Sequence, residues 1–223
     1  MLKSIFRSVF CVFRKELICG MRFKAAWAVM LMFALTALSC VSLAIRGMHL
    51  EASTAAAFLW IILFFAATAG IDRVFETEYA SGTILSLRIY GPSQAVLFGK
   101  MLYVFCLLLL LAIFVVPLYL IFMDAVPAYG LLLLGTLAAG LWGMAALGTI
   151  VAAMSGASAV HGGLFPVLML PLILPVFLLA ISLTTAAFGD GEPEFQYLLA
   201  MLAYDAAVTA GSSILFDYIW YEG

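Results

Sequence analysis

The residues able to do redox, metal or nucleotide chemistry are few and scattered along the chain. Neither His49 nor His161 has a second ligand three or four residues away. The four cysteines show no C-x-x-C or other metal-ligand spacing: Cys11, Cys19, Cys40 and Cys106. No Walker A sequence (G-x-x-x-x-G-K-[ST]) occurs, so ATP hydrolysis is not assigned to this chain. We therefore expect no enzyme and no metal site, with the histidines as interfacial residues and the cysteines as packing residues.

Asp205 is an ionisable residue inside an apolar stretch. A carboxylate facing lipid costs a few kcal/mol on insertion scales, so we expect Asp205 to face protein or a water-filled cavity. Two roles stay open, an intramembrane functional group and a protonated or hydrogen-bonded structural residue.

Prolines interrupt another apolar stretch, between residues 163 and 188. Pro171 and Pro175, together with Pro166, lack backbone N–H donors and should bend a helix there. Pro171 and Pro175 are hinge candidates, with a static kink as the alternative.

The longest hydrophilic stretch, residues 72–100, carries the strongest functional signal. Its first part should continue the preceding helix with four charged side chains exposed: Asp72, Arg73, Glu76 and Glu78. Gly82 is a helix C-cap signal, and a short amphipathic helix with Leu85 and Leu87 should follow and stop at Gly91. A helix that exposes apolar and charged groups suits docking to a separate motor protein. An ordinary loop with its apolar face on lipid headgroups is the alternative.

The composition indicates which elements must position these residues. Hydrophobic residues make up 67% of the 223 residues and charged residues 10%, and the mean hydropathy is +1.22. A soluble domain carries about a quarter charged residues, so we expect an all-α polytopic membrane protein. One crossing takes about 20 apolar residues. Six runs qualify: 25–45, 52–71, 101–123, 129–153, 163–188 and 197–220. A five-span arrangement stays open because Asp205 and Asp217 interrupt the last run.

Residues 1–24 form an amphipathic segment before the first run. Apolar residues recur at helical spacing, with Lys3, Arg7, Arg14 and Lys15 largely on the other face. This pattern predicts an interfacial helix on an anionic leaflet, with an extension of the first span as the alternative. The whole chain should form one permease domain, without a cleavable signal peptide.

Charge asymmetry predicts the orientation. Short cytoplasmic segments retain Lys and Arg, and nearly all basic residues lie before the first run or in the 72–100 loop. Both termini and that loop should therefore be cytoplasmic, with the acidic connection at 189–196 outside.

Small and aromatic residues inside the runs predict helix packing. Ridges of small residues let helices approach closely, within one subunit or between two copies: Gly135, Ala139 and Gly143, and Ala203, Ala207 and Gly211. Aromatic belts account for most Trp and Tyr residues but less easily for Trp60 and Trp142.

Three stretches resemble the CcmB family, the heme-exporter permeases of cytochrome c maturation. They are 72–87 (DRVFETEYASGTILSL) with Lys100, 13–17 (FRKEL) with Arg22, and 170–176 (LPLILPV). One departure concerns residues 155–161 (SGASAVH), where the family commonly has basic residues and this chain has only His161. An electrostatic contact of this second loop with an ATPase is correspondingly less supported.

The resemblance implies a six-span, ABC-2-type permease subunit of the bacterial inner membrane, usually paired. Such a subunit binds the cytoplasmic ATPase CcmA, assembles with CcmC and CcmD, and serves heme delivery to the carrier CcmE. Heme is then a transported or handled ligand, and whether this subunit conducts it stays open. In this interpretation four residues of the loop dock into the ATPase while Gly82 permits the turn: Glu76, Glu78, Leu85 and Leu87.

Other functional classes remain. An ABC-2-type exporter of a drug, lipid or polysaccharide would share the topology and the coupling loop. A membrane scaffold without transport would bind partners but not depend on ATP turnover. An ion-coupled carrier has less support, because a single intramembrane carboxylate is a thin basis for a relay.

Overall fold

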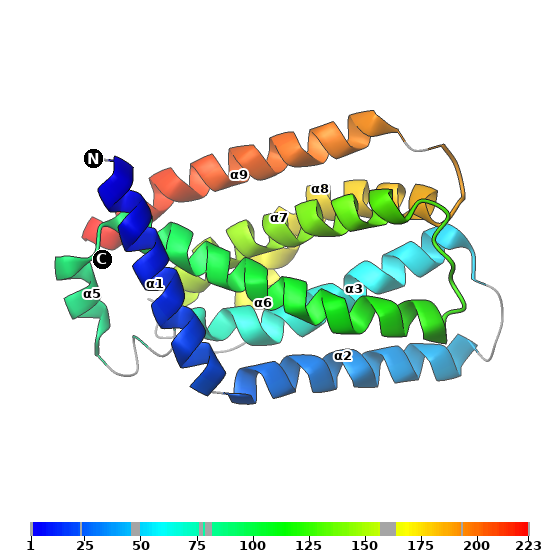
Figure 1. The fold of residues 1–223 in the computed structure, drawn as a ribbon, viewed down its shortest axis with the longest axis horizontal. Coiled ribbons are helices and arrows are strands. Elements are labelled where there is room, and N and C mark those ends of the chain that lie inside the picture. Colours follow the sequence, from blue (N-terminus) through cyan, green and yellow to red (C-terminus); the bar gives the residue numbers. More distant parts are fainter. Residues whose placement is uncertain are drawn as a thin grey trace.

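The chain is a bundle of long helices in a computed structural model (Figure 1). The structure describes residues 2–22, 24–45, 50–75, 78, 82–156, 164–192 and 194–222, and this part of the chain contains no strand. The elements are α1 (Leu2–Arg22), α2 (Lys24–Ile45), α3 (Ala52–Ile71), the 3-10 helix η1 (Asp72–Val74), α5 (Ile84–Tyr90), α6 (Ser93–Phe122), α7 (Gly130–Gly156), α8 (Leu164–Ala187) and α9 (Phe195–Glu222).

Six of these helices, α2, α3 and α6 to α9, are long and apolar enough to cross a membrane. The predicted all-α polytopic fold with six spans is therefore confirmed. The sixth helix, α9, runs without interruption through Asp205 and Asp217. Both acidic residues lie on the side of α9 that contacts other helices, which removes the reason for a five-span arrangement.

The third membrane helix begins earlier than predicted. Helix α6 starts at Ser93, whereas the apolar run suggested residue 101. The error arose from treating Lys100 as a loop residue, because a lysine is expensive in an apolar helix. Lys100 is fully buried and ion-paired, so the helix includes it. The connection between α3 and α6 therefore ends at Pro92.

The N-terminal helix α1 is a separate element and not an extension of α2. It crosses the end of the bundle at a steep angle to α2 (Figure 1). It packs closely on α6, since a Cβ on Gly99 would lie 2.7 Å from Val12, and one on Gly20 would lie 2.3 Å from the Tyr103 hydroxyl. Phe6, Phe10 and Met21 remain exposed on α1.

Helix α3 lies at the centre of the bundle, and Trp60 is its largest buried side chain. The Trp60 indole N–H donates to the Thr184 hydroxyl at 3.0 Å. The ring stands over Gly140 of α7, where a Cβ would come within 2.3 Å of it. Trp60 is therefore a core residue that joins α3, α7 and α8.

The two predicted ridges of small residues differ in whether they pack against another helix. On α7, Ala139 is buried and Gly143 faces Asp205, whereas Gly135 faces open space. On α9, the ridge of Ala203, Ala207 and Gly211 is exposed, so it does not pack within the described part of this subunit.

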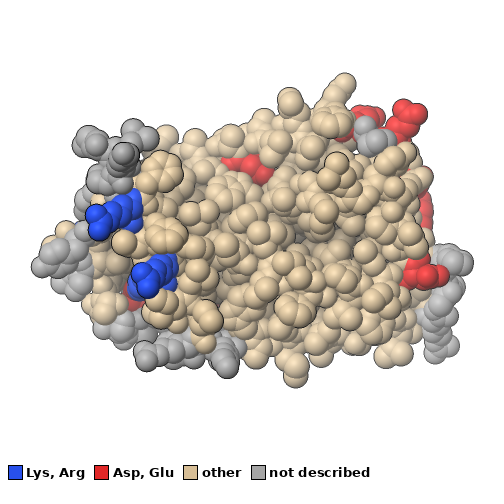
Figure 2. All heavy atoms as spheres, viewed as in Figure 1, with Lys and Arg blue, Asp and Glu red and all other residues tan. Residues whose placement is uncertain are grey.

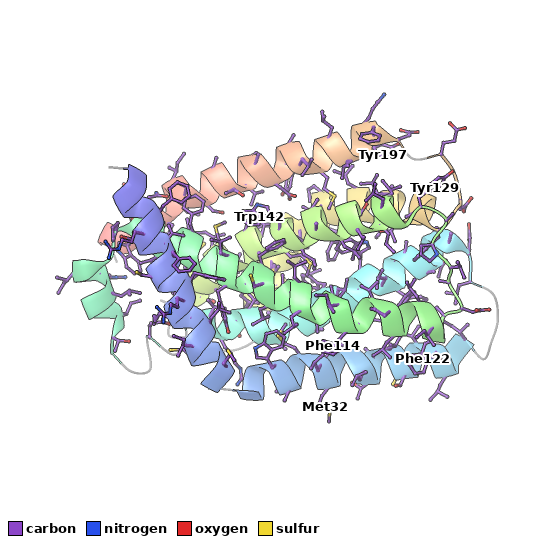
Figure 3. The ribbon with its side chains drawn as sticks, viewed as in Figure 1. Met32, Phe114, Phe122, Tyr129, Trp142 and Tyr197 are labelled. Atoms are coloured by element: carbon purple, nitrogen blue, oxygen red, sulfur yellow. The ribbon has the colours of Figure 1, made fainter. Side chains whose placement is uncertain are left out.

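The middle of the outer surface exposes apolar side chains, as expected for contact with lipid, and one end carries aromatic residues. Met32 and Phe114 point outward from α2 and α6 and are 64% and 52% exposed (Figure 3). Phe122, Tyr129 and Tyr197 gather at one end, as in an aromatic belt (Figure 3).

Candidate functional site

The polar connection between α3 and α6 begins with η1 and turns sharply at Gly82. Gly82 has φ +67°, a left-handed conformation that glycine adopts without strain. The Thr83 N–H donates to the Glu78 carbonyl at 3.1 Å, the hydrogen bond of a Schellman C-cap. The predicted C-cap at Gly82 is confirmed.

Helix α5 follows this turn and extends beyond the end of the bundle (Figure 1). Ile84 and Leu87 pack against the core, while Ile89 is 69% exposed. The Gly91 N–H donates to the Leu87 carbonyl at 2.8 Å, and Pro92 then ends the connection. The predicted short amphipathic helix is present. Leu87 faces the bundle, so Ile89 is the described apolar residue that α5 offers to a partner.

Four charged residues from three segments meet beneath this connection. The Lys100 ammonium of α6 lies 2.9 Å from a Glu78 carboxylate oxygen and 3.0 Å from one of Glu16 in α1. It also donates to the Val74 carbonyl at 2.6 Å. Lys15 of α1 lies 3.0 Å from the same Glu16 oxygen and is also ion-paired to Glu78. We call these four residues the charge cluster: Lys15, Glu16, Glu78 and Lys100.

The charge cluster is balanced, and its electrostatics favour ionised side chains. Burial alone would raise the pKa of Glu78, but Lys100 and Lys15 outweigh burial and lower it to about 2. Burial alone would lower the pKa of Lys15, but attraction by Glu16 and Glu78 raises it above its ordinary value. With two positive and two negative groups, the cluster can lie in the protein interior because each charge has an opposite partner.

The structure corrects the predicted exposure of Glu78. Its side chain is only 4% exposed and is held by Lys15 and Lys100, so it cannot dock directly into another protein. Asp72 is half-buried and Arg73 is exposed. Glu76 and the side chain of Leu85, both predicted docking residues, lie outside the described part of the structure.

A row of aromatic rings runs from the charge cluster to α5. The Lys100 ammonium lies 4.4 Å from the centre of the Phe75 ring. Phe75 is 6.2 Å from Phe216 of α9, and Phe216 stacks on Trp220 at 5.1 Å. The Arg88 guanidinium of α5 lies 5.8 Å from the Trp220 ring. These contacts connect α5 to the cluster through the C-terminal part of α9.

The start of α6 is tied to the same part of α9. The Gln94 amide donates to an Asp217 carboxylate oxygen at 2.7 Å, and the Ser93 hydroxyl donates to the other. A carboxylate is favourable near a helix N-terminus, where the backbone N–H groups and the helix dipole carry partial positive charge. Asp217 therefore joins α9 to the first residues of α6 instead of interrupting a span.

Asp205 faces protein, as predicted. Its side chain is buried, and neither carboxylate oxygen has a hydrogen-bond partner. A Cβ on Gly143 would lie 2.4 Å from Asp205 Oδ1, so the carboxyl group occupies the notch that this glycine leaves on α7. Next to it, the Trp142 indole N–H donates to Thr209 at 3.3 Å, so Trp142 joins α7 to α9 (Figure 3).

The proline-containing helix α8 is continuous through Pro171 and Pro175. The Tyr204 hydroxyl of α9 donates to the Leu172 carbonyl at 2.7 Å, within the proline-containing turn. The hinge role of the two prolines stays a prediction.

Metal ligation finds no support in the described ranges, where no group of three His, Cys, Asp or Glu residues could hold an ion. His49 and His161 lie outside these ranges. The four cysteines are free thiols.

The two ends of the bundle differ in charge. Figure 2 shows Lys and Arg at the end where α1 and α5 lie, and most of the visible Asp and Glu at the other. Exposed Arg7, Arg14 and Arg73 belong to the first end. The exposed acidic residues Glu51, Asp124, Asp190, Glu192 and Glu194 belong to the second.

Comparison with known proteins decides the family. The model of the family described as CcmB protein matches residues 7–217, nearly the whole chain. This chain belongs to the CcmB family. It is accordingly a multi-pass transporter permease component of heme export for cytochrome c maturation, and not an enzyme. No curated protein matches the chain at a significant level of similarity.

Two of the three CcmB-like sequence stretches meet in the charge cluster. Lys15 and Glu16 come from the stretch at 13–17, and Glu78 and Lys100 come from the stretch around 72–100. Both stretches were identified in the sequence, but the ion pairs between them were not predicted. The signal available was the coincidence of opposite charges, Lys15-Glu16 in one stretch and Glu78 with Lys100 in the other.

Proposed function

We propose that this CcmB protein is the membrane permease of a heme-delivery complex driven by a separate cytoplasmic ATPase of the CcmA type. The position of α5 is the main observation that supports docking of the ATPase to this chain. This helix extends from the basic end of the bundle with Ile89 exposed, and it is anchored to the bundle through Gly82, Glu78 and Lys100.

The basic end is the cytoplasmic end in this proposal. The positive-inside rule favours this orientation, and both termini lie at that end (Figure 1). The acidic end then faces the periplasm across a bacterial inner membrane.

Movement of the ATPase would reach the membrane helices through the charge cluster. Glu78 follows η1 and precedes the Gly82 turn, and it is paired to both α6 and α1. Displacing the connection therefore pulls on Lys100 and Lys15 together. Glu78 acts in this mechanism as a positioning residue, and Ile89, Leu85 and Arg73 are the proposed docking residues.

Membership of the CcmB family supports the remaining parts of the proposed complex. CcmC-like and CcmD-like membrane proteins and a second permease copy would cover exposed faces such as those of α2 and α9. Heme is the ligand that the complex handles, without an assigned site in this chain. Pro171 and Pro175 are the proposed hinge, and Asp205 is the proposed intramembrane group.

The docking part is tested with Ile89→Asp. A buried carboxylate at the centre of the docking surface should release the ATPase from membranes and abolish covalent heme on periplasmic c-type cytochromes. Val126→Asp is the matched control, because Val126 is 80% exposed in the connection at the opposite end. Full retention of the ATPase by correctly inserted Ile89→Asp protein would exclude α5 as the docking element.

The heme part is tested by deleting the gene. We expect heme staining of c-type cytochromes to be lost and to return with the wild-type chain. Unchanged staining in the deletion strain would favour an exporter of another substrate.

A further inference from the structure

Two hydrogen-bond donors beside α5 have no acceptor. The Arg88 Nε and the Trp220 Nε1 are both buried and without a hydrogen-bond partner. The guanidinium carbon of Arg88 lies 5.8 Å from the centre of the Trp220 ring, so the two unpaired donors belong to side chains in contact with each other. Buried donors normally have a partner, and leaving one unpaired is unfavourable. The site therefore fits a missing acceptor.

Trp220 gives Arg88 a fixed platform. Its side chain is 4% exposed and stacks on Phe216, which in turn contacts Phe75. Arg88 itself is only half-buried, so the rest of its guanidinium remains accessible. A planar guanidinium held over an aromatic ring is already oriented for two parallel hydrogen bonds to a carboxylate.

Three acidic side chains that the structure describes at this end of the bundle already have partners. Glu16 and Glu78 neutralise the two lysines of the charge cluster, and Asp217 accepts from Ser93 and Gln94. None of the described residues forms a salt bridge with Arg88. The Arg88 Nε has no acceptor among the described residues, so an acceptor from another molecule fits this position.

We infer that Arg88 receives a carboxylate of the ATPase subunit, from an Asp or Glu beside an apolar pocket for Ile89. This inference rests on the proposed docking of α5. It reverses the charge pattern suggested by the sequence, in which Glu76 and Glu78 supplied the charges of the contact. The permease is the basic partner at this contact, and the ATPase is the acidic one.

A lipid phosphate is the competing acceptor, and the arrangement of the helices disfavours it. The lipid-directed surface at this end is on α1, where exposed Phe6, Phe10 and Met21 accompany Arg7 and Arg14. Helix α5 lies farther out along the bundle axis than α1 (Figure 1). Its position therefore favours a protein partner.

The experiment measures binding of the purified CcmA-type ATPase to the full-length permease in detergent. Arg88→Glu should weaken binding at least about tenfold, because it places like charges in the contact. Arg88→Lys should bind with intermediate affinity, since it keeps the charge but loses the planar fork. Arg14→Glu is the matched control, with an exposed arginine reversed at the same end on α1, and should bind like the wild type. Reversing the partner Asp or Glu of the ATPase to Arg should restore binding to Arg88→Glu.

The outcomes separate this inference from the proposed function. If Ile89→Asp abolishes binding and Arg88→Glu binds like the wild type, α5 docks without the carboxylate and the inference is overturned alone. If both variants bind like the wild type, the docking proposal fails as well. A defect of Arg88→Glu that appears only in vesicles with anionic lipid would assign the acceptor to lipid and overturn the inference. Equal thermal unfolding of Arg88→Glu and the wild type shows that loss of binding is not loss of fold.

Discussion

The charge cluster and Asp205 are two opposite ways to bury ionisable groups in an apolar bundle. In the cluster, two lysines and two glutamates from distant parts of the chain neutralise one another. Asp205 has no partner for either oxygen and is accommodated only by the notch at Gly143. The cluster ties α1, the connection between α3 and α6, and α6 itself into one unit, because each charge depends on the others. At Asp205, close packing against Gly143 positions the side chain, and among the described residues no ion pair joins α7 to α9.

The largest effect is expected from removing one charge of the cluster. Lys100→Met leaves two buried carboxylates facing one ammonium, which should destabilise the fold by about 3–5 kcal/mol. Thermal unfolding in detergent measures this loss, and Arg73→Met is the control because Arg73 is exposed. Adding Glu78→Gln to Lys100→Met leaves the balanced pair of Lys15 and Glu16 and should recover part of the stability. Equal unfolding temperatures of Lys100→Met and the wild type would show that the cluster does not brace the bundle.

The next effect tests whether shape holds Asp205. Gly143→Ala places a methyl group on the carboxyl oxygen, and overpacking of this kind costs about 1–3 kcal/mol. Gly135→Ala, on the same helix, meets nothing within 4 Å and should leave the unfolding temperature unchanged. A Gly143→Ala protein as stable as Gly135→Ala would mean that α9 does not pack against α7 in this way.

A smaller effect on stability is expected when the pH is lowered. The pKa of Glu78 is lowered from 4.5 to about 2, so its contribution to stability is complete above pH 4.5 and is lost as the pH falls toward 2. We expect the unfolding temperature of the wild type to drop between pH 4.5 and pH 2. Glu78→Gln should drop less over the same interval, because it has no such proton to take up. The same drop in both proteins would indicate that Glu78 is not ion-paired in the folded state.

The smallest effect is expected at Asp205. Asp205→Asn keeps the shape and removes the ionisable group, and because the carboxyl group has no hydrogen-bond partner to lose, the change in stability should stay within about 1 kcal/mol. Unfolding temperature and heme staining of c-type cytochromes are read on the same strain. Normal assembly with normal staining would assign Asp205 a structural role only, whereas lost staining with normal assembly would make it a functional group.

Local patterns predicted much of this molecule. Apolar runs gave the six membrane helices, Gly82 gave the C-cap, and the cost of a lipid-facing carboxylate placed Asp205 against protein. The predictions that Glu78 is exposed and that the third membrane helix starts at residue 101 were wrong for the same reason. Pairing between residues 15, 78 and 100 depends on the tertiary fold, so a lysine and a glutamate that hydropathy assigns to a loop lie in the interior. The unpaired donors of Arg88 and Trp220 were likewise invisible in the sequence.

The proposed coupling requires that the connection between α3 and α6 lies in the cytosol and is covered by the ATPase. In a chain free of its native cysteines, Thr83→Cys places a thiol at an exposed site of this connection, and Glu192→Cys places one at the acidic end. With a membrane-impermeant maleimide, we predict labelling of Glu192→Cys in intact spheroplasts. Thr83→Cys should be labelled only in inverted vesicles, and less so when the ATPase is bound. Labelling of Thr83→Cys from outside intact spheroplasts would contradict the account.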